Sequence, residues 1–189
     1  MKNIKNLKIK TTEGLEVKNL QRFPSMEWGD EGGLQAEVHL NGKLIGTLYQ
    51  AGNGGCANFT YNNSDDYAEL AKAIIIFLKR VDKNYGPNSK YNWLKNKATY
   101  RDIGDDDIEA AVNNIEERYD DIQVAKKIFK KGYQAVALLK NDFSTQYLQY
   151  KVADITMEEV NEWLIHHPDI KKKYPEVTLI RSTDNLTVL

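Results

Sequence analysis

The pair Asn41-Gly42 constrains the fold of this chain more than any other feature. A two-residue type I′ turn needs positive φ at both central positions, and Asn-Gly meets that requirement readily. Apolar and polar residues alternate on both sides of the pair, which indicates strands over 34–40 and 43–50. The sequence therefore predicts an antiparallel hairpin in which Leu40 faces Lys43.

This turn also predicts which side chains of the hairpin are buried. A regular ladder from Leu40 and Lys43 places the following residues on one face, which we expect to be buried: Leu34, Ala36, Val38, Leu40, Ile45, Thr47 and Tyr49. The other face would carry Gln35, Glu37, His39, Leu44, Gly46 and Leu48. A slip of one residue would exchange the two faces, so the expectation depends on the register.

The same register brings two loops together at the open end of the hairpin. An acidic loop enters the first strand, and a glycine-rich loop at 51–56 leaves the second. The residues that we predict to form a binding surface are Glu27, Trp28, Asp30, Glu31, Asn53, Gly54, Gly55 and Cys56. Trp28 either fills the core or contacts a partner, because tryptophan is common in both roles.

The glycine loop itself allows two interpretations. Glycines permit positive φ and a close approach of a ligand to backbone N–H groups. However, the loop 52–55 matches neither GxxxxGK[ST] nor GxGxxG, and a strand rather than a helix is expected to follow it. It is therefore either a wide hairpin connection or a contact for a ligand or partner.

We expect no catalytic residues and no metal or cofactor site. A nucleophilic Cys56 would need a nearby base, but the register places His39 at the turn end of the hairpin, ~23 Å away at ~3.3 Å per residue. Unpaired cysteines are commonly buried small apolar residues. His166 and His167 are neighbours at a predicted helix end, where a protonatable group suits the helix dipole, and no spaced ligand set accompanies them.

Composition excludes several classes of protein. The 26 basic and 27 acidic residues balance, so nothing indicates a nucleic-acid or membrane partner. One cysteine cannot form a disulfide framework, and we expect a reducing, cytoplasmic setting. The longest apolar run, at 73–78, is too short to cross a bilayer.

The remaining elements indicate an α+β fold. Before the hairpin we expect strands at 7–11 and 15–23, and after it a strand at 57–61 and a helix at 64–85 with Ser64 as its N-cap. A weaker pattern suggests a short helix at 91–94. A long helix at 106–131 begins at three aspartates and ends at lysines before Gly132, as the helix dipole favours.

The C-terminal part reads as strands at 133–140, 145–152 and 176–181 around one helix. Thr156 and Glu159 are spaced as a capping box at the start of that helix. The tail from Ser182 is expected to be loosely ordered. The predicted architecture is an N-terminal antiparallel sheet with a packed helix, a long bridging helix and a C-terminal ββαβ lobe, divided as 1–104 and 105–189.

One part of the hairpin resembles a known pattern. Residues 37–46, followed by Asn53-Gly54-Gly55, form a strand, a turn ending in Gly-Lys, a short apolar strand ending in glycine, and a Gly-Gly loop. This order resembles a hairpin found in small uncharacterised proteins of bacteria and their phages. The resemblance implies no activity, and it favours an accessory protein encoded by a phage or another mobile element.

Two functions from different classes remain. The leading hypothesis is a non-enzymatic protein that binds an unidentified protein partner through the two loops, with a second surface at the basic helix end formed by Lys126, Lys127, Lys130 and Lys131. The alternative is a protein that binds a small ligand or nucleotide at Gly52–Gly55, with hydrolytic chemistry as an extension. The sequence does not indicate an oligomeric state.

Overall fold

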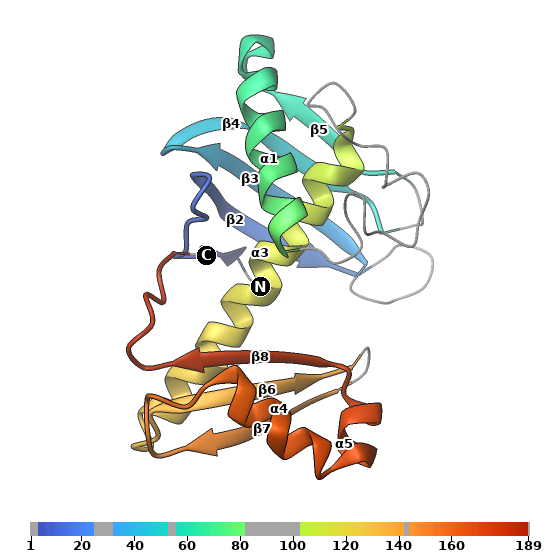
Figure 1. Ribbon diagram of the computed structural model, residues 1–189. Coiled ribbons are helices and arrows are strands. Elements are labelled where there is room, and N and C mark those ends of the chain that lie inside the picture. The colour runs from blue at the N-terminus through green and yellow to red at the C-terminus, as the bar shows by residue number, and fades with distance from the viewer. Residues whose placement is uncertain (1–3, 25–31, 53–55, 82–102, 142–143, 189) are drawn as a thin grey trace. The chain divides into compact units, whose positions relative to one another are not determined.

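A computed structural model describes residues 4–24, 32–52, 56–81, 103–141 and 144–188 (Figure 1). The described chain contains helices and two antiparallel sheets, which confirms the predicted α+β class. It forms two compact units: unit 1 comprises 1–119 with 187–189, and unit 2 comprises 120–186. The predicted division of the chain into lobes 1–104 and 105–189 stays a prediction.

Unit 1 contains a five-stranded antiparallel sheet in simple sequential order. Its strands are β1 (Ile4–Lys5), β2 (Leu15–Phe23), β3 (Gly33–Leu40), β4 (Lys43–Gln50) and β5 (Asn58–Tyr61). The predicted strand at 7–11 is wrong, because β1 lies earlier. Leu7 and Ile9 are nevertheless buried, and Lys10 forms an isolated parallel bridge with Val188.

The hairpin turn is as predicted, but the regular ladder is wrong beyond it. Leu40 faces Lys43, and Asn41 and Gly42 both have positive φ. A bulge at Ile45 then shifts the register, so that Val38 faces Gly46. A regular strand cannot bury two residues three positions apart on one face, whereas the bulge buries both Ile45 and Leu48.

This shift moves two residues out of the predicted core. Thr47 is only partly buried and Tyr49 is 46% exposed, on the face opposite to Leu48. The gain is the complete burial of Leu48, worth about 2 kcal/mol. Gly46 is required at the shifted position, because a Cβ atom there would collide with the Phe59 ring and the Thr60 carbonyl.

Two helices cover one face of this sheet, as Figure 1 shows. They are α1 (Tyr67–Val81) and the unit 1 part of α3 (Asp105–Phe129), and a short 3-10 turn, η1 (Ser64–Asp66), precedes α1. The predicted cap at Ser64 is wrong by one residue, because the Asn63 side chain accepts the Asp65 amide instead. The predicted extension of α1 to residue 85 and the short helix at 91–94 lie outside the described residues.

Unit 2 is a three-stranded antiparallel sheet with helices on both faces. Its elements are β6 (Ala135–Lys140), β7 (Thr145–Tyr150), α4 (Met157–Ile165), α5 (Pro168–Lys173) and β8 (Glu176–Arg181), with strand order β7-β6-β8. One face packs against the end of α3, where Ala125 and Ile128 meet Val136 and Leu138. The other face packs against α4 through Val160 and Leu164.

Local signals in unit 2 behave largely as predicted. Thr156 and Glu159 form both hydrogen bonds of the capping box, and Gly132 has a φ of 87° just after α3. Helix α5 was not expected. The loosely ordered tail is wrong for the residues described: Asp184 accepts the Arg181 amide, and the Lys10 amide donates to the Thr187 carbonyl.

Candidate binding surface

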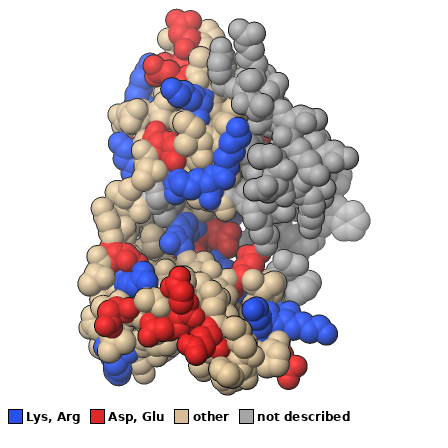
Figure 2. Space-filling model, viewed as in Figure 1, with Lys and Arg blue, Asp and Glu red and all other residues tan. Residues whose placement is uncertain are grey.

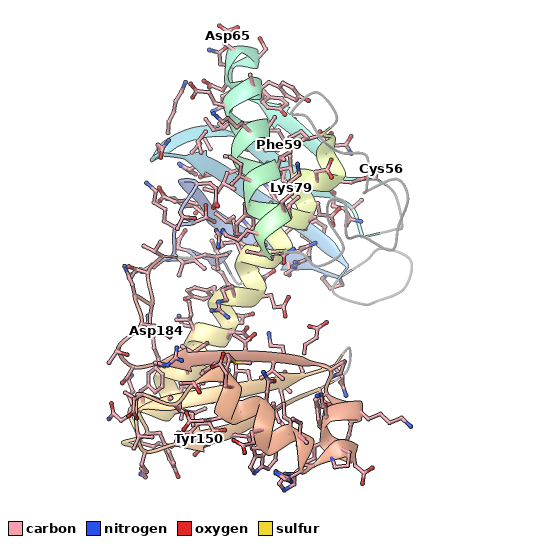
Figure 3. The ribbon with its side chains drawn as sticks, viewed as in Figure 1. Cys56, Phe59, Asp65, Lys79, Tyr150 and Asp184 are labelled. Carbon is pink, nitrogen blue, oxygen red and sulfur yellow. The ribbon has the colours of Figure 1, made fainter. Side chains whose placement is uncertain are left out.

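The structure describes only part of the predicted binding surface. Glu27, Trp28, Asp30, Glu31, Asn53, Gly54 and Gly55 lie outside the described residues, so the two interpretations of Trp28 stay open. Cys56 is described and is exposed rather than buried (Figure 3).

The residues that flank the two loops do lie together. A Cβ atom on Gly52 would stand 2.5 Å from the Gly33 nitrogen, and one on Gly32 would stand 3.1 Å from the Gly52 carbonyl oxygen. Only glycine fits this close approach, and Gly52 also has a φ of 77°. The acidic loop therefore ends beside the start of the glycine loop. A regular ladder counted from Leu40 and Lys43 would pair Gly33 with Gln50, whereas the bulge pairs Leu34 with Gln50.

One amide of the glycine loop is already engaged. The Gly52 N–H donates to the side-chain Oε1 of Gln50 at 2.7 Å. An anion-binding loop needs several free N–H groups that converge on one point. Gly52 does not supply one, and the strand β5, rather than a helix N-terminus, follows the loop.

Beside these loops, an aromatic pair lies on the face of the sheet opposite to α1 and α3, here called the outer face. The rings of Phe23 and Tyr49 stack with centroids 5.8 Å apart. Phe23 pairs with Gly33, and any side chain on Gly33 would collide with the Phe23 ring. Because Gly33 has no side chain, the Phe23 ring can lie across β3 and stack on the Tyr49 ring.

The half of the outer face nearest the loops carries no charged residue among those described. The pairing places at least one uncharged residue from each strand there: Ile4, Gln21, Phe23, Gln35, Tyr49 and Asn58. We call this set the uncharged face. Two of its large side chains are well exposed, Ile4 at 52% and Tyr49 at 46%.

The charges of the outer face gather at the opposite end, near the hairpin turn. Glu16, Lys18, Glu37 and His39 lie there in register. The Lys18 Nζ is 3.4 Å from Glu16, and His39 Nε2 is 3.3 Å from Glu37. A hydrogen bond from Asn19, helped by His39 and Lys18, lowers the pKa of Glu37 against the effect of its burial. His39 therefore lies at the turn end of the hairpin, away from Cys56, as the sequence predicts.

The helix-covered side of unit 1 has a different character. Helix α1 exposes Glu69, Lys72, Lys79 and Arg80, and Figure 2 shows blue and red atoms interspersed on this side. In unit 2, red atoms gather over α4, which exposes Glu158, Glu159 and Glu162. The uncharged face therefore contrasts with surfaces that carry the chain's charged residues.

Of the two adjacent histidines, His167 has a structural role at a helix end. The His167 ring stacks on Trp163 with centroids 3.8 Å apart, and its Nδ1 lies 2.8 Å from the Trp163 carbonyl oxygen. This contact gives a hydrogen-bond partner to one of the backbone carbonyl groups in the last turn of α4. Across the described ranges, no group of three or more His, Cys, Asp or Glu side chains could hold a metal ion.

The basic end of α3 lines a shallow hollow. Its lining includes Gln123, Phe129 and three lysines, Lys126, Lys127 and Lys130, and its volume is about 500 Å³. Lysines at a helix C-terminus stabilise the helix through its dipole, which accounts for their position without a ligand. This secondary surface stays a prediction.

Comparison with known proteins adds nothing to these residues: no protein-family model, curated protein or solved structure matches the chain. The resemblance of the hairpin to bacterial and phage proteins thus stays a prediction. Among the described helices, none is long and apolar enough to cross a membrane.

Sequence reasoning missed the uncharged face for one reason. The regular ladder assigned Thr47 and Tyr49 to the core, whereas the bulge at Ile45 turns them outward. A signal was present, because Ile45 and Leu48 are both strongly apolar and both need burial. Gly46 between them is the residue type that often marks a bulge.

Proposed function

We propose that the protein is a non-enzymatic accessory protein that binds a protein partner through the uncharged face of unit 1. The observation that carries the proposal is the absence of charge from the described residues of this face, in a chain with 28% charged residues. The centres of protein interfaces are depleted in charged residues and enriched in aromatic ones. The lone cysteine supports a cytoplasmic setting, where thiols stay reduced.

The aromatic pair supplies the expected centre of the contact. Tyr49 combines an exposed ring with a hydroxyl, and its stacking on Phe23 restricts its motion before a partner arrives. Tyrosine is enriched among the residues that dominate binding energy, because a large rigid side chain loses little entropy on binding. Around it, the side-chain amides of Gln21, Gln35 and Asn58 can exchange hydrogen bonds with a partner surface that is itself low in charge.

The described residues favour this function over nucleotide or small-ligand binding at Gly52–Gly55. A ligand site needs a concave pocket with converging polar groups. The Gly52 amide is instead committed to Gln50, and Cys56 is exposed.

The test is capture of a partner with purified protein as bait in an extract of the native host, followed by measurement of Kd with the isolated partner. Tyr49→Ala should weaken binding at least tenfold, since a central aromatic side chain commonly contributes more than about 1.4 kcal/mol. The matched control is Lys72→Ala on the helical side, which should leave Kd unchanged. Circular dichroism confirms that both variants are folded.

Two results would contradict the proposal. One is a partner whose Kd is the same for wild type and Tyr49→Ala. The other is a rise in melting temperature with a nucleotide that disappears in Gly54→Ala, because a ligand that binds only the folded state raises stability. The second result would establish the ligand-binding alternative instead.

A further inference from the structure

The edges of the two sheets differ in how they are protected. An edge strand presents unpaired N–H and C=O groups that can pair with another strand, and proteins usually block them. In unit 1, β5 is blocked because the Asp105 carboxylate accepts the Phe59 amide at 2.9 Å, and β1 has only two residues. In unit 2, the Asp184 carboxylate accepts the Arg181 amide of β8 at 2.7 Å; Figure 3 labels Asp184.

Strand β7 is the edge without such protection. Its sequence, TQYLQY, has no charged residue and no proline, and its pairing with β6 continues without a bulge from Thr145 to Tyr150. Tyr147 is 50% exposed. Lysine, proline and bulges are the usual means of blocking an edge, and this strand has none of them.

The hydrogen-bond pattern shows which groups of β7 point outward. The Asn141 amide donates to the Ser144 carbonyl, and the Gln134 amide donates to the Tyr150 carbonyl. Because inward and outward groups alternate in an antiparallel pair, the even-numbered residues bond to β6. The N–H and C=O groups of Thr145, Tyr147 and Gln149 therefore point away from the sheet, and among the described residues none of them has a hydrogen-bond partner.

We propose that β7 pairs antiparallel with β7 of a second copy of this chain, around a two-fold axis beside Tyr147, to form a continuous six-stranded sheet. The three outward-pointing residues are symmetric about Tyr147, so this axis pairs every outward group. Tyr147 faces the partner's Tyr147, and Thr145 faces the partner's Gln149. A two-fold contact of this kind is self-complementary and closes as a dimer.

The side chains suit this self-pairing. On one face the two Tyr147 rings meet, and on the other Gln146 faces the partner's Leu148. Aromatic pairs across strands stabilise a sheet, whereas like charges directly opposite destabilise it. Since residues 144–150 carry no charge, no position opposes its own charge across the axis. The contact is small, so the dimer is weak, with a Kd on the order of 10–100 µM.

The first test is sedimentation equilibrium of the full chain between about 5 and 500 µM, a range chosen around that Kd. Wild type and Tyr147→Phe should approach a dimer as concentration rises. Tyr147→Lys should remain a monomer, because it opposes two positive charges and protects the edge. Tyr49→Lys, on the uncharged face, should dimerise like wild type, which separates this proposal from the proposed function.

A second test does not depend on a variant that abolishes pairing. In a Cys56→Ser background, Tyr147→Cys places two thiols on strands whose Cα atoms are ~5.5 Å apart, within disulfide range. Under mild oxidation it should form a covalent dimer at least tenfold faster than Lys79→Cys on α1. A monomer at every concentration, a dimer unaffected by Tyr147→Lys, or equal cross-linking rates would overturn the proposal.

Discussion

At the scale of single residues, Glu116 joins α3 to the sheet of unit 1 through three hydrogen bonds from charged side chains. Arg22 donates to its Oε2 through Nη2 at 2.7 Å and Nε at 3.0 Å, and Lys5 donates to Oε1 at 3.0 Å. Burial alone would raise the pKa of Glu116, but the bonds and charges of Arg22 and Lys5 outweigh it and hold the pKa below the ordinary 4.5. Glu116 is therefore ionised in the folded protein at neutral pH.

We expect Glu116→Gln to lower the free energy of unfolding by about 2 kcal/mol at pH 7, because charged hydrogen bonds to Arg22 and Lys5 are lost. The lowered pKa means that this stabilisation is present above pH 4.5 and is lost as pH falls through the folded-state pKa. Urea unfolding at pH 7 and pH 3 measures both effects. The difference in the free energy of unfolding between wild type and variant should be smaller at pH 3 than at pH 7. An equal difference at both pH values would contradict a stabilising role of the ionised Glu116. The control Glu162→Gln, at an exposed site, should change stability by less than about 0.5 kcal/mol.

At the scale of secondary-structure elements, α4 depends on its cap. Thr156 Oγ1 accepts the Glu159 amide, and Glu159 Oε2 accepts the Thr156 amide at 2.7 Å. Thr156→Ala should therefore destabilise unit 2 by about 1 kcal/mol, whereas Thr156→Ser keeps the hydroxyl and should stay close to wild type. Thermal unfolding of the three proteins measures this. Equal losses in both variants would show that the methyl group, not the cap, is responsible.

The elements themselves could be predicted where the signals are local. The capping box, the Asn41-Gly42 turn and the glycine after α3 each follow from the chemistry of two or three neighbouring residues. Helix α5 is different, because its six residues begin only two residues after α4, which leaves His166 and His167 between the helices, and its N-cap forms no side-chain hydrogen bond. Strand β1 is two residues long, too short for any alternation to show.

The candidate surface could be predicted in position but not in composition. The turn correctly indicates that Gly32 and Gly52, which flank the two loops, lie side by side, because that depends only on where the strands end. Side chains alternate between the two faces of a strand, so a single bulge exchanges the faces of all the residues that follow it. Thr47 rather than Ile45 faces outward because the bulge buries Leu48 beside its partner Phe59, a residue of another strand that local sequence reasoning does not consider.

At the scale of the whole molecule, one helix belongs to two cores. Residues 105–119 of α3 lie in unit 1 and residues 120–129 lie in unit 2. Leu48 is fully buried in unit 1, and Leu138 is fully buried in unit 2 on the α3 face of its sheet. An α-helix propagates cooperatively along its length, so α3 is the element through which loss of one core can reach the other.

We expect the two cores to unfold separately all the same, because each buries its own set of large apolar side chains. Leu138→Ala should cost about 3 kcal/mol and should speed amide exchange in β6 while β4 keeps its protection; Leu48→Ala should do the reverse. Hydrogen exchange measured by mass spectrometry resolves both strands. Equal loss of protection in β4 and β6 in either variant would show one cooperative unit. Amide exchange in residues 105–119 then locates the boundary between the two units. If these amides lose protection in Leu48→Ala, the boundary lies within α3. If they lose protection in Leu138→Ala, it lies before residue 105, where the sequence predicts it.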